Sequence, residues 1–229
     1  MIKATYIDHM GSDLSVVNAA RVSFGKVSEL ETVDWVNGRE VKGLSERDTK
    51  LIHYLAKHNH ISPFGHAFAS FHVKAPIFVA RQLVKHKFLR WNEISRRYVD
   101  DNVEFYVPDV WRGRSADKKQ GSDGVIYYNY EKYMHETERR SFGVDQVCLE
   151  EYRDMLAAGV APEQARMVLP QSTMTEWYWS GSLDAFAAMC QLRCKPDTQY
   201  ESRLVADQIS EKMGELFPVS WSALMAGEK

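Results

Sequence analysis

Alternating apolar and polar residues mark several short strands along the chain. Residues 3–7 predict an edge strand, and residues 67–74 alternate in the manner of a strand with two different faces. Residues 173–179 are dense in aromatic and β-branched side chains, which favour strands. Residues 96–99 and 103–107 are also predicted to be extended. The predicted strands therefore lie in both halves of the chain.

Helical spacing and end signals mark the segments between these strands. Ser45 is a predicted N-cap, because its hydroxyl can accept a hydrogen bond from the amide of Asp48, and this helix should end near Asn59. Further helices are predicted at 14–24, 77–85, 127–158, 162–169 and 183–192, with a last one passing through 204–213. Residues 25–43 and 109–124 are read as a polar stretch and an exposed loop. Without a regular βαβ pattern, the fold class is α+β, an antiparallel sheet flanked by helices.

Composition narrows the class of protein. The chain has 229 residues, and its 29 basic and 31 acidic side chains leave a net charge of −2, which is ordinary for a globular protein. No apolar run approaches the roughly 20 residues that cross a bilayer, and the first residues do not resemble a signal peptide. The odd count of 3 cysteines suits a reducing compartment. We therefore expect a cytoplasmic protein that does not bind membranes.

Positive charge is concentrated in residues 81–98, RQLVKHKFLRWNEISRRY, with Glu93 as the acid among them. Arginine and lysine bind phosphate well, so a small phosphorylated ligand is one interpretation. Phe88, Trp91 and Tyr98 could stack on bases, so a nucleic-acid-binding module is another, although the overall charge argues against it. A solvated basic surface is the third. The histidines at 58, 60, 66 and 72 fit no zinc spacing, and no metal site is expected.

Taken together, these segments resemble the flavin-dependent thymidylate synthase family. The family signature RHRxxSxNxxSxR corresponds here to Lys85-His86-Lys87 followed by Arg90, Asn92, Ser95 and Arg97. Its other motifs occur in order as AARVSF at 19–24, HxSPFxH at 60–66, FHVKAPIFVARQ at 71–82, EFYVP at 104–108, ARxVLP at 165–170 and LR at 192–193. Lysines replace both signature arginines, which keeps the charge but loses the planar guanidinium.

The resemblance implies one domain spanning residues 1–229, in a homotetramer whose active sites are shared between chains. It implies conversion of dUMP to dTMP, with FAD as redox cofactor, NADPH as reductant and methylenetetrahydrofolate as one-carbon donor. A related flavin-dependent C5 methylase or hydroxymethylase, acting on another pyrimidine nucleotide such as UMP, is the alternative within the same pattern. The partners are then small molecules and copies of this chain rather than nucleic acid.

The resemblance also assigns roles to particular residues. Arg193 is the catalytic candidate, because a guanidinium can stabilise negative charge as it builds in the uracil ring. On position alone, it could equally be a cation at a helix carboxyl end. The residues implied to bind dUMP are Gln82, Lys85, Glu93, Ser95, Arg96, Arg97, Arg166 and Arg193. Those implied to contact FAD are Ser62, Lys85, His86, Lys87, Glu93 and Ser182.

Overall fold

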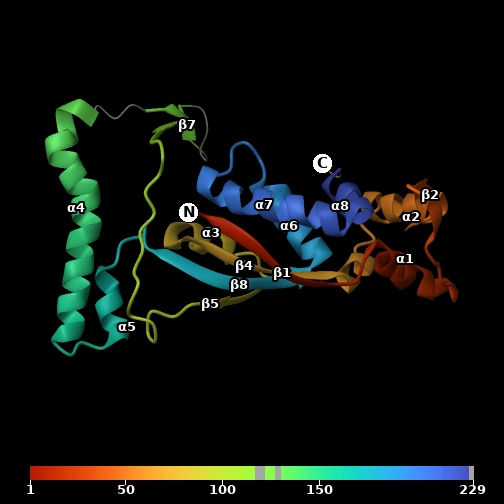
Figure 1. The fold of residues 1–229 in the computed structure, drawn as a ribbon, viewed down its shortest axis with the longest axis horizontal. Coiled ribbons are helices and arrows are strands. Elements are labelled where there is room, and N and C mark those ends of the chain that lie inside the picture. Colours follow the sequence, from red (N-terminus) through yellow and green to blue (C-terminus); the bar gives the residue numbers. More distant parts are fainter. Residues whose placement is uncertain (117–121, 127–129, 227–229) are drawn as a thin grey trace.

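A four-stranded antiparallel sheet lies at the centre of the computed structural model, which describes residues 1–116, 122–126 and 130–226 (Figure 1). Its strands, in spatial order, are β1 (Lys3–Met10), β4 (Phe68–Pro76), β8 (Met174–Ser182) and β5 (Arg90–Glu93). The strands predicted at 3–7, 67–74 and 173–179 are confirmed, and the first does lie at an edge. The α+β class with an antiparallel sheet is also confirmed.

The alternation of side chains gives the sheet two unlike faces. Phe71 in β4 lies opposite Trp179 in β8, and both are buried under α3 (Ile77–Leu83), α6 (Leu183–Arg193) and α7 (Tyr200–Leu216). Figure 1 shows these helices on the same side of the sheet. On the other side, the hydroxyls of Ser70 and Ser180 lie 2.8 Å apart and are partly exposed. The main hydrophobic core therefore lies between the sheet and one helical layer.

A second helical group packs at one end of the sheet. It consists of α1 (Asp13–Arg21) with the short 3-10 helix η1 (Val22–Phe24), α2 (Glu46–Lys57), the 3-10 helix η2 (Ser62–His66) and α8 (Pro218–Met225). The predicted cap of α2 is confirmed, since the Asp48 amide donates to the Ser45 hydroxyl at 3.1 Å. Buried Asp13 accepts hydrogen bonds from the first amides of α8, at 3.0 and 2.9 Å. This contact ties the two ends of the described chain together.

The long helix α4 (Tyr130–Ala157) stands at the opposite end of the molecule, away from the sheet (Figure 1). It is followed by α5 (Pro162–Ala165) and the 3-10 helix η3 (Arg166–Val168). Leu149, Tyr152 and Ala165 form a separate buried cluster there. The long helix and the short one after Pro162 are confirmed, with Gly159 between them at a φ of +83°. Residues 127–129, where the long helix was expected to begin, lie outside the described residues.

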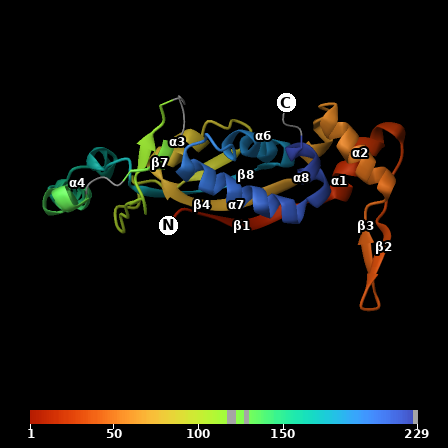
Figure 2. The ribbon, with the colours of Figure 1, turned by 90° about the horizontal axis from the view of Figure 1, so that it is seen from above.

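Two segments read as irregular contain hairpins. Residues 25–43 hold β2 (Glu31–Val36) and β3 (Arg39–Gly43), whose turn has positive φ angles at Asn37 and Gly38. This hairpin projects from the body of the molecule (Figure 2). Residues 109–124 hold β6 (Arg112–Arg114) and the start of β7 (Ser122–Val125), while residues 117–121 of that predicted loop lie outside the described chain. Backbone pairing thus organises segments whose side chains are mostly exposed.

The prediction of an extended segment at 96–99 is wrong. The carbonyl of Ser95 accepts from the amides of both Tyr98 and Val99 at 3.0 Å, which closes a turn there. The strand lies just before it, at Arg90–Glu93, and α8 was not predicted at all. Among the described residues, no helix is both long enough and apolar enough to cross a membrane.

Candidate active site

The ends of two helices on the same side of the sheet bring Arg193 and His86 together. Arg193 is the last residue of α6, and His86 follows α3, held by a hydrogen bond from its amide to the Leu83 carbonyl. The Arg193 Nε donates to His86 Nε2 at 3.2 Å, and its Nη2 lies 3.4 Å from the Gln82 carbonyl oxygen. Three of the residues assigned from sequence therefore form one cluster, although Arg193 is more than a hundred positions from Gln82 and His86.

The electrostatics of this pair favour a neutral imidazole beside a charged guanidinium. Burial and then the positive charge of Arg193 lower the pKa of His86 to about 4. Burial also lowers the pKa of Arg193, but a guanidinium stays charged at neutral pH. Because His86 Nε2 accepts from Arg193, the imidazole proton resides on Nδ1. Among the residues whose side chains the structure describes, Arg193 forms no ion pair with a carboxylate, so its charge remains available to a ligand.

Two exposed lysines lie on either side of His86. Neither Lys85 nor Lys87 has a hydrogen bond or ion pair with any other residue that the structure describes. The loop that carries them passes close to Gly181, where an added Cβ would lie only 2.5 Å from Leu89 Cδ2. A glycine at 181 therefore allows this loop to approach the end of β8.

The remaining predicted flavin contacts lie at the same end of β8, apart from Glu93. Ser182 ends β8 and is the N-cap of α6, and the Leu183 amide donates to the Ala67 carbonyl at 2.8 Å. This bond joins α6 to the chain that leaves η2, the 3-10 helix in which Ser62 is the first residue. The loop beside Gly181, the end of β8 and η2 therefore surround one end of the two central strands.

Glu93 lies on the edge strand β5 and is held by its neighbours. Its Oε1 accepts from the Thr175 hydroxyl at 2.6 Å, and its Oε2 accepts from Trp91 Nε1 at 3.1 Å. The Trp91 ring is itself stacked on Trp177, with ring centroids 4.2 Å apart. One face of the Trp91 ring is therefore already occupied within the chain, which leaves less of it for the base stacking that the nucleic-acid interpretation required.

The guanidinium of Arg96 is used within its own loop. It donates to the carbonyls of Asp101 at 2.6 Å and Val99 at 3.4 Å. The neighbouring Ser95 hydroxyl accepts from the amide of Arg97 at 3.3 Å. The Arg96 side chain thus stabilises the turn, and a direct contact to a nucleotide remains a prediction for this residue.

Two of the arginines assigned to dUMP form a separate group near α5. Arg97 pairs with the carboxylate of Glu163 at 3.2 Å, and Arg166 Nε donates to the Glu163 carbonyl, also at 3.2 Å. Figure 1 shows α5 beside α4 and away from α6, which carries Arg193. Within one chain, the structure therefore divides the predicted nucleotide ligands into two groups.

A polar network attached to Gln82 was not predicted from the sequence. The Gln82 amide donates to Gln199 Oε1 and accepts from the Ser202 hydroxyl at 3.2 Å. Gln199 Nε2 then donates to Glu201 Oε2 at 3.3 Å. Glu201 is only 4% exposed and is ion-paired with Arg112. The network connects the candidate site to the beginning of α7.

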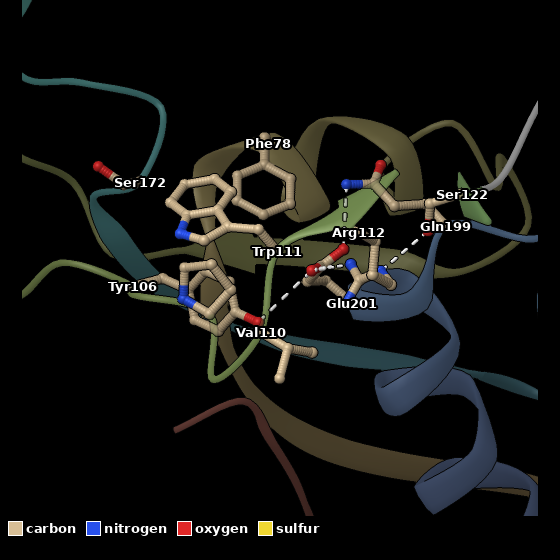
Figure 3. A pocket seen from close by; sticks show the side chains of 10 residues that line it. Phe78, Tyr106, Val110, Trp111, Arg112, Ser122, Ser172, Gln199 and Glu201 are labelled. Carbon is tan, nitrogen blue, oxygen red and sulfur yellow. Dashed lines mark hydrogen bonds and ion pairs between the residues drawn. The ribbon is translucent and has the colours of Figure 1, made fainter. Parts of the chain in front are cut away.

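This network borders a cavity of about 500 Å³, shown in Figure 3. The rings of Phe78, Tyr106 and Trp111 line one side, and the Arg112–Glu201 pair lies on the other. Burial and the nearby Glu201 charge raise the pKa of Tyr106 to about 12, so this hydroxyl stays protonated. Tyr106 lies within the EFYVP motif but was not assigned a role from the sequence. Arg112 and Glu201 are 89 positions apart and have no local signal.

No group of three or more His, Cys, Asp or Glu side chains is placed to hold a metal ion in the part of the chain that the structure describes.

Known proteins match this chain over most of its length. Residues 5–219 match the family described as thymidylate synthase complementing protein. A flavin-dependent thymidylate synthase of Thermus thermophilus is 38% identical over 218 residues, which cover 95% of this chain and 73% of that protein. The flavin-dependent thymidylate synthase of Kosmotoga olearia is 37% identical over 225 residues, which cover 96% and 88%.

A solved structure also matches the whole fold. The UMP/dUMP methylase PolB from Streptomyces cacaoi, bound with 5-Br dUMP, superimposes with a TM-score of 0.80 at 31% identity. The match covers 99% of this chain and 95% of that one.

Proposed function

Because the chain belongs to the flavin-dependent thymidylate synthase family, whose members are methyltransferases, we propose that it catalyses the reductive methylation of dUMP to dTMP. In this reaction the methylene carbon of methylenetetrahydrofolate replaces the hydrogen on C5 of uracil. NADPH supplies the hydride that makes the carbon a methyl group, and a proton is taken up. The other products are tetrahydrofolate and NADP⁺. Bound FAD supplies the redox chemistry between the reductant and the carbon.

The observation that carries this proposal is the cluster of Arg193, His86 and Gln82. C5 of uracil becomes nucleophilic only as negative charge builds in the ring, and a fixed guanidinium stabilises that charge where it develops. Arg193 is fixed by two hydrogen bonds and is not neutralised by any carboxylate of the described residues. The neutral His86 orients it without taking its charge. This arrangement supports a catalytic role rather than a helix-end role alone.

The side chains present fit a flavin nucleotide. Lys85 and Lys87 offer two exposed positive charges, which suit a diphosphate. The Nδ1–H of His86 remains a donor for a ring acceptor, since Nε2 is already engaged with Arg193. Ser62 and Ser182 add hydroxyls at the same end of the sheet. We assign these residues, with Glu93, to FAD.

The phosphate of dUMP is assigned to the second group of cations. Arg97 and Arg166 lie together around Glu163, and Ser95 lies two residues before Arg97. Arg193 and Gln82 belong to the other group of dUMP ligands, along with Lys85, while Glu93 and Arg96 come from the edge strand and its turn. This division supports a homotetramer in which neighbouring chains complete each site, each chain contributing one domain of residues 1–229.

A specific observation favours UMP methylation as a second candidate. Lysines occupy both arginine positions of the signature, and the similar solved structure described above is that of a UMP/dUMP methylase. UMP differs from dUMP only by the ribose 2′-hydroxyl. A site that accepts both needs no change in the chemistry at C5, only room for that hydroxyl.

Cofactor binding and product analysis test the proposal. We expect FAD added to apo-protein to lose fluorescence in a saturable way, and NADPH to bleach the bound flavin. Lys87→Ala should weaken FAD, whereas Lys57→Ala, at an exposed position of α2, should not. Chromatography of reactions with dUMP and with UMP then identifies the methylated product. Failure to bind FAD would contradict the proposal, and product from UMP alone would select the second candidate.

A further inference from the structure

The hydrogen bonds that join Glu201 to Gln82 have a fixed direction. A carboxylate only accepts hydrogen bonds, and Glu201 accepts from Arg112, from the Tyr106 hydroxyl at 3.5 Å and from Gln199 Nε2 at 3.3 Å. Gln199 must therefore turn its amino group toward Glu201. Its carbonyl oxygen then faces Gln82.

The direction is passed on to Gln82 in the same way. The Gln199 oxygen can only accept, so Gln82 turns its amino group toward it. The Gln82 oxygen then accepts from the Ser202 hydroxyl at 3.2 Å, and Ser202 is fully buried. One N–H and one oxygen lone pair of the Gln82 amide remain unused in this network. Their positions are set by Glu201, two hydrogen bonds away.

We propose that Glu201 is a specificity-determining residue, which makes the site accept uracil nucleotides and reject cytosine nucleotides by locking the orientation of the Gln82 amide. The inference rests on the proposed function, which assigns Gln82 to the pyrimidine nucleotide. Uracil offers a donor at N3 and an acceptor at O4, whereas cytosine offers an acceptor at N3 and a donor at N4. An amide that rotates freely matches either edge by turning over. An amide held in one orientation matches only one of them.

The residues around Glu201 keep the Gln82 amide in one orientation. Glu201 is 4% exposed and forms an ion pair with Arg112. The Tyr106 hydroxyl stays a donor because its pKa is raised to about 12. Arg112 in turn lies over the Tyr200 ring, 4.5 Å from its centroid, and donates to Ser122 at 2.9 Å. Each hydrogen-bonded neighbour of the carboxylate donates to it, so Glu201 remains an acceptor in all of these contacts.

The variant Glu201→Gln tests this directly, because a glutamine keeps the size but offers both a donor and an acceptor. Gln199 can then turn over, and Gln82 with it. We expect the ratio of the dissociation constants of dCMP and dUMP, measured by calorimetry on the FAD-loaded protein, to fall about tenfold or more. Glu215→Gln, the same change in an exposed ion pair of the same helix, should leave the ratio unchanged.

A second variant tests the proposal even if the Glu201→Gln protein does not fold. Ser202→Ala removes the hydroxyl that holds the Gln82 oxygen and should lower the same ratio to a smaller extent. A ratio that stays constant in the folded variants, even with both affinities weakened, would overturn the lock and leave Glu201 a structural role. Wild-type protein that binds neither dUMP nor UMP would instead contradict the proposed function. The two failures are therefore distinguishable.

Discussion

At the scale of single residues, Arg193 is held by neutral acceptors rather than by a carboxylate of the described residues. Arginines near a protein surface commonly pair with carboxylates, but here the acceptor is an imidazole nitrogen and a backbone carbonyl. The guanidinium is thereby oriented while its positive charge remains unneutralised. Both members lie where water is partly excluded, which strengthens their interaction with a charged ligand.

Replacing Arg193 tests its catalytic role. Arg193→Ala should lower the rate of dTMP formation by about 10² to 10³-fold, because it removes a charge that acts on the pyrimidine ring. Flavin reduction by NADPH should change much less, and Arg193→Lys should restore only part of the rate, since lysine lacks the planar fork. Stopped-flow measurement separates the two half-reactions. Equal losses in both would point to a structural role, and Arg39→Ala, in the exposed hairpin, serves as the control.

His86 should make folding sensitive to mild acid. Its pKa is about 4 in the folded protein against 6.5 for a free side chain, so the unfolded chain takes up this proton first. The stability that His86 contributes is complete above pH 6.5 and is lost as the pH falls toward 4. After a discount for partial exposure, we expect a loss of about 1 kcal/mol between pH 7 and 5. Urea denaturation of wild type and His86→Gln measures it, and identical pH slopes would refute it.

Arg97 should bind the nucleotide phosphate. Arg97→Ala should weaken dUMP by roughly 1.5 to 3 kcal/mol, the scale of a hydrogen bond to a charged group, with flavin content nearly intact. Arg166→Ala should act in the same way. Calorimetry with dUMP and with deoxyuridine is the measurement, and Arg47→Ala, exposed on α2, is the control. Equal affinity of the wild type for the two ligands would remove the phosphate assignment.

The sequence was sufficient to identify those site residues that lie within short sequence motifs. Gln82 and His86 lie in two adjoining motifs, and Arg193 follows its own short one, so their assembly in one cluster could be anticipated. Glu201 and Arg112 could not, because an ion pair across 89 positions depends on how the helices and the loop pack. Burial is what gives Glu201 its importance, and burial is not visible in a charged residue met in a sequence.

At the scale of elements, α2 shows how a local capping signal determines where a helix begins. The Ser45 hydroxyl accepts from the Asp48 amide and also donates to the Asp48 carboxylate at 3.0 Å. Arg21 pairs with the same carboxylate, so one capping residue also joins α2 to α1. Burial raises the pKa of Asp48, but hydrogen bonds from these side chains and the Arg21 charge together outweigh it and hold the pKa below its usual value.

Removing this cap should cost measurable stability. We expect Ser45→Ala to lower the free energy of unfolding by about 1 kcal/mol, because an amide of the first turn loses its acceptor and Asp48 loses a donor. Chemical denaturation followed by circular dichroism measures the change. Ser222→Ala, at an exposed position inside α8, should have nearly no effect. Equal changes in the two variants would contradict the capping role.

The elements that sequence reasoning missed were hidden by their polar side chains. Asn37-Gly38 is a strong turn signal between two strands, but the charged residues around it favoured an irregular segment. The edge strand at Arg90–Glu93 was read for its charge, for base stacking and for the family signature, but not as a strand. Its place beside β8 follows from the packing of Trp91 on Trp177, a contact between distant segments. By contrast, β4 and β8 could be predicted from their apolar sequence patterns alone, without knowledge of contacts between distant segments.

At the scale of the whole molecule, one face of the sheet lacks a helical cover. In the described chain, helices lie on one side of the four strands (Figures 1 and 2). The strand register and the burial pattern place Ser70, His72 and Tyr178 on the other side. Tyr178 is half exposed, and His72 contacts Glu176 at 3.2 Å. The predicted dUMP ligands are also divided between two groups. Both features are expected if other copies of the chain complete the structure.

We therefore expect a tetramer in solution. Light scattering across a dilution series should give a mass near four times the 26.4 kDa of one chain, and activity should fall if the assembly dissociates. Mixing Arg193→Ala with Arg166→Ala protein should restore activity, because shared sites would then include some with both arginines intact. A stable and fully active monomer would contradict the shared site.

The projecting hairpin of β2 and β3 has a consequence for how the chain tolerates cleavage. A two-stranded ribbon whose side chains are almost all exposed opens readily, so trypsin should reach Arg39 and Lys42 before any bond in the central sheet. The two pieces would stay together. The first carries β1, which pairs with β4 along its length, and Asp13, which binds the start of α8 in the second. A nicked protein should therefore behave as a split protein whose halves reassemble around the same sheet.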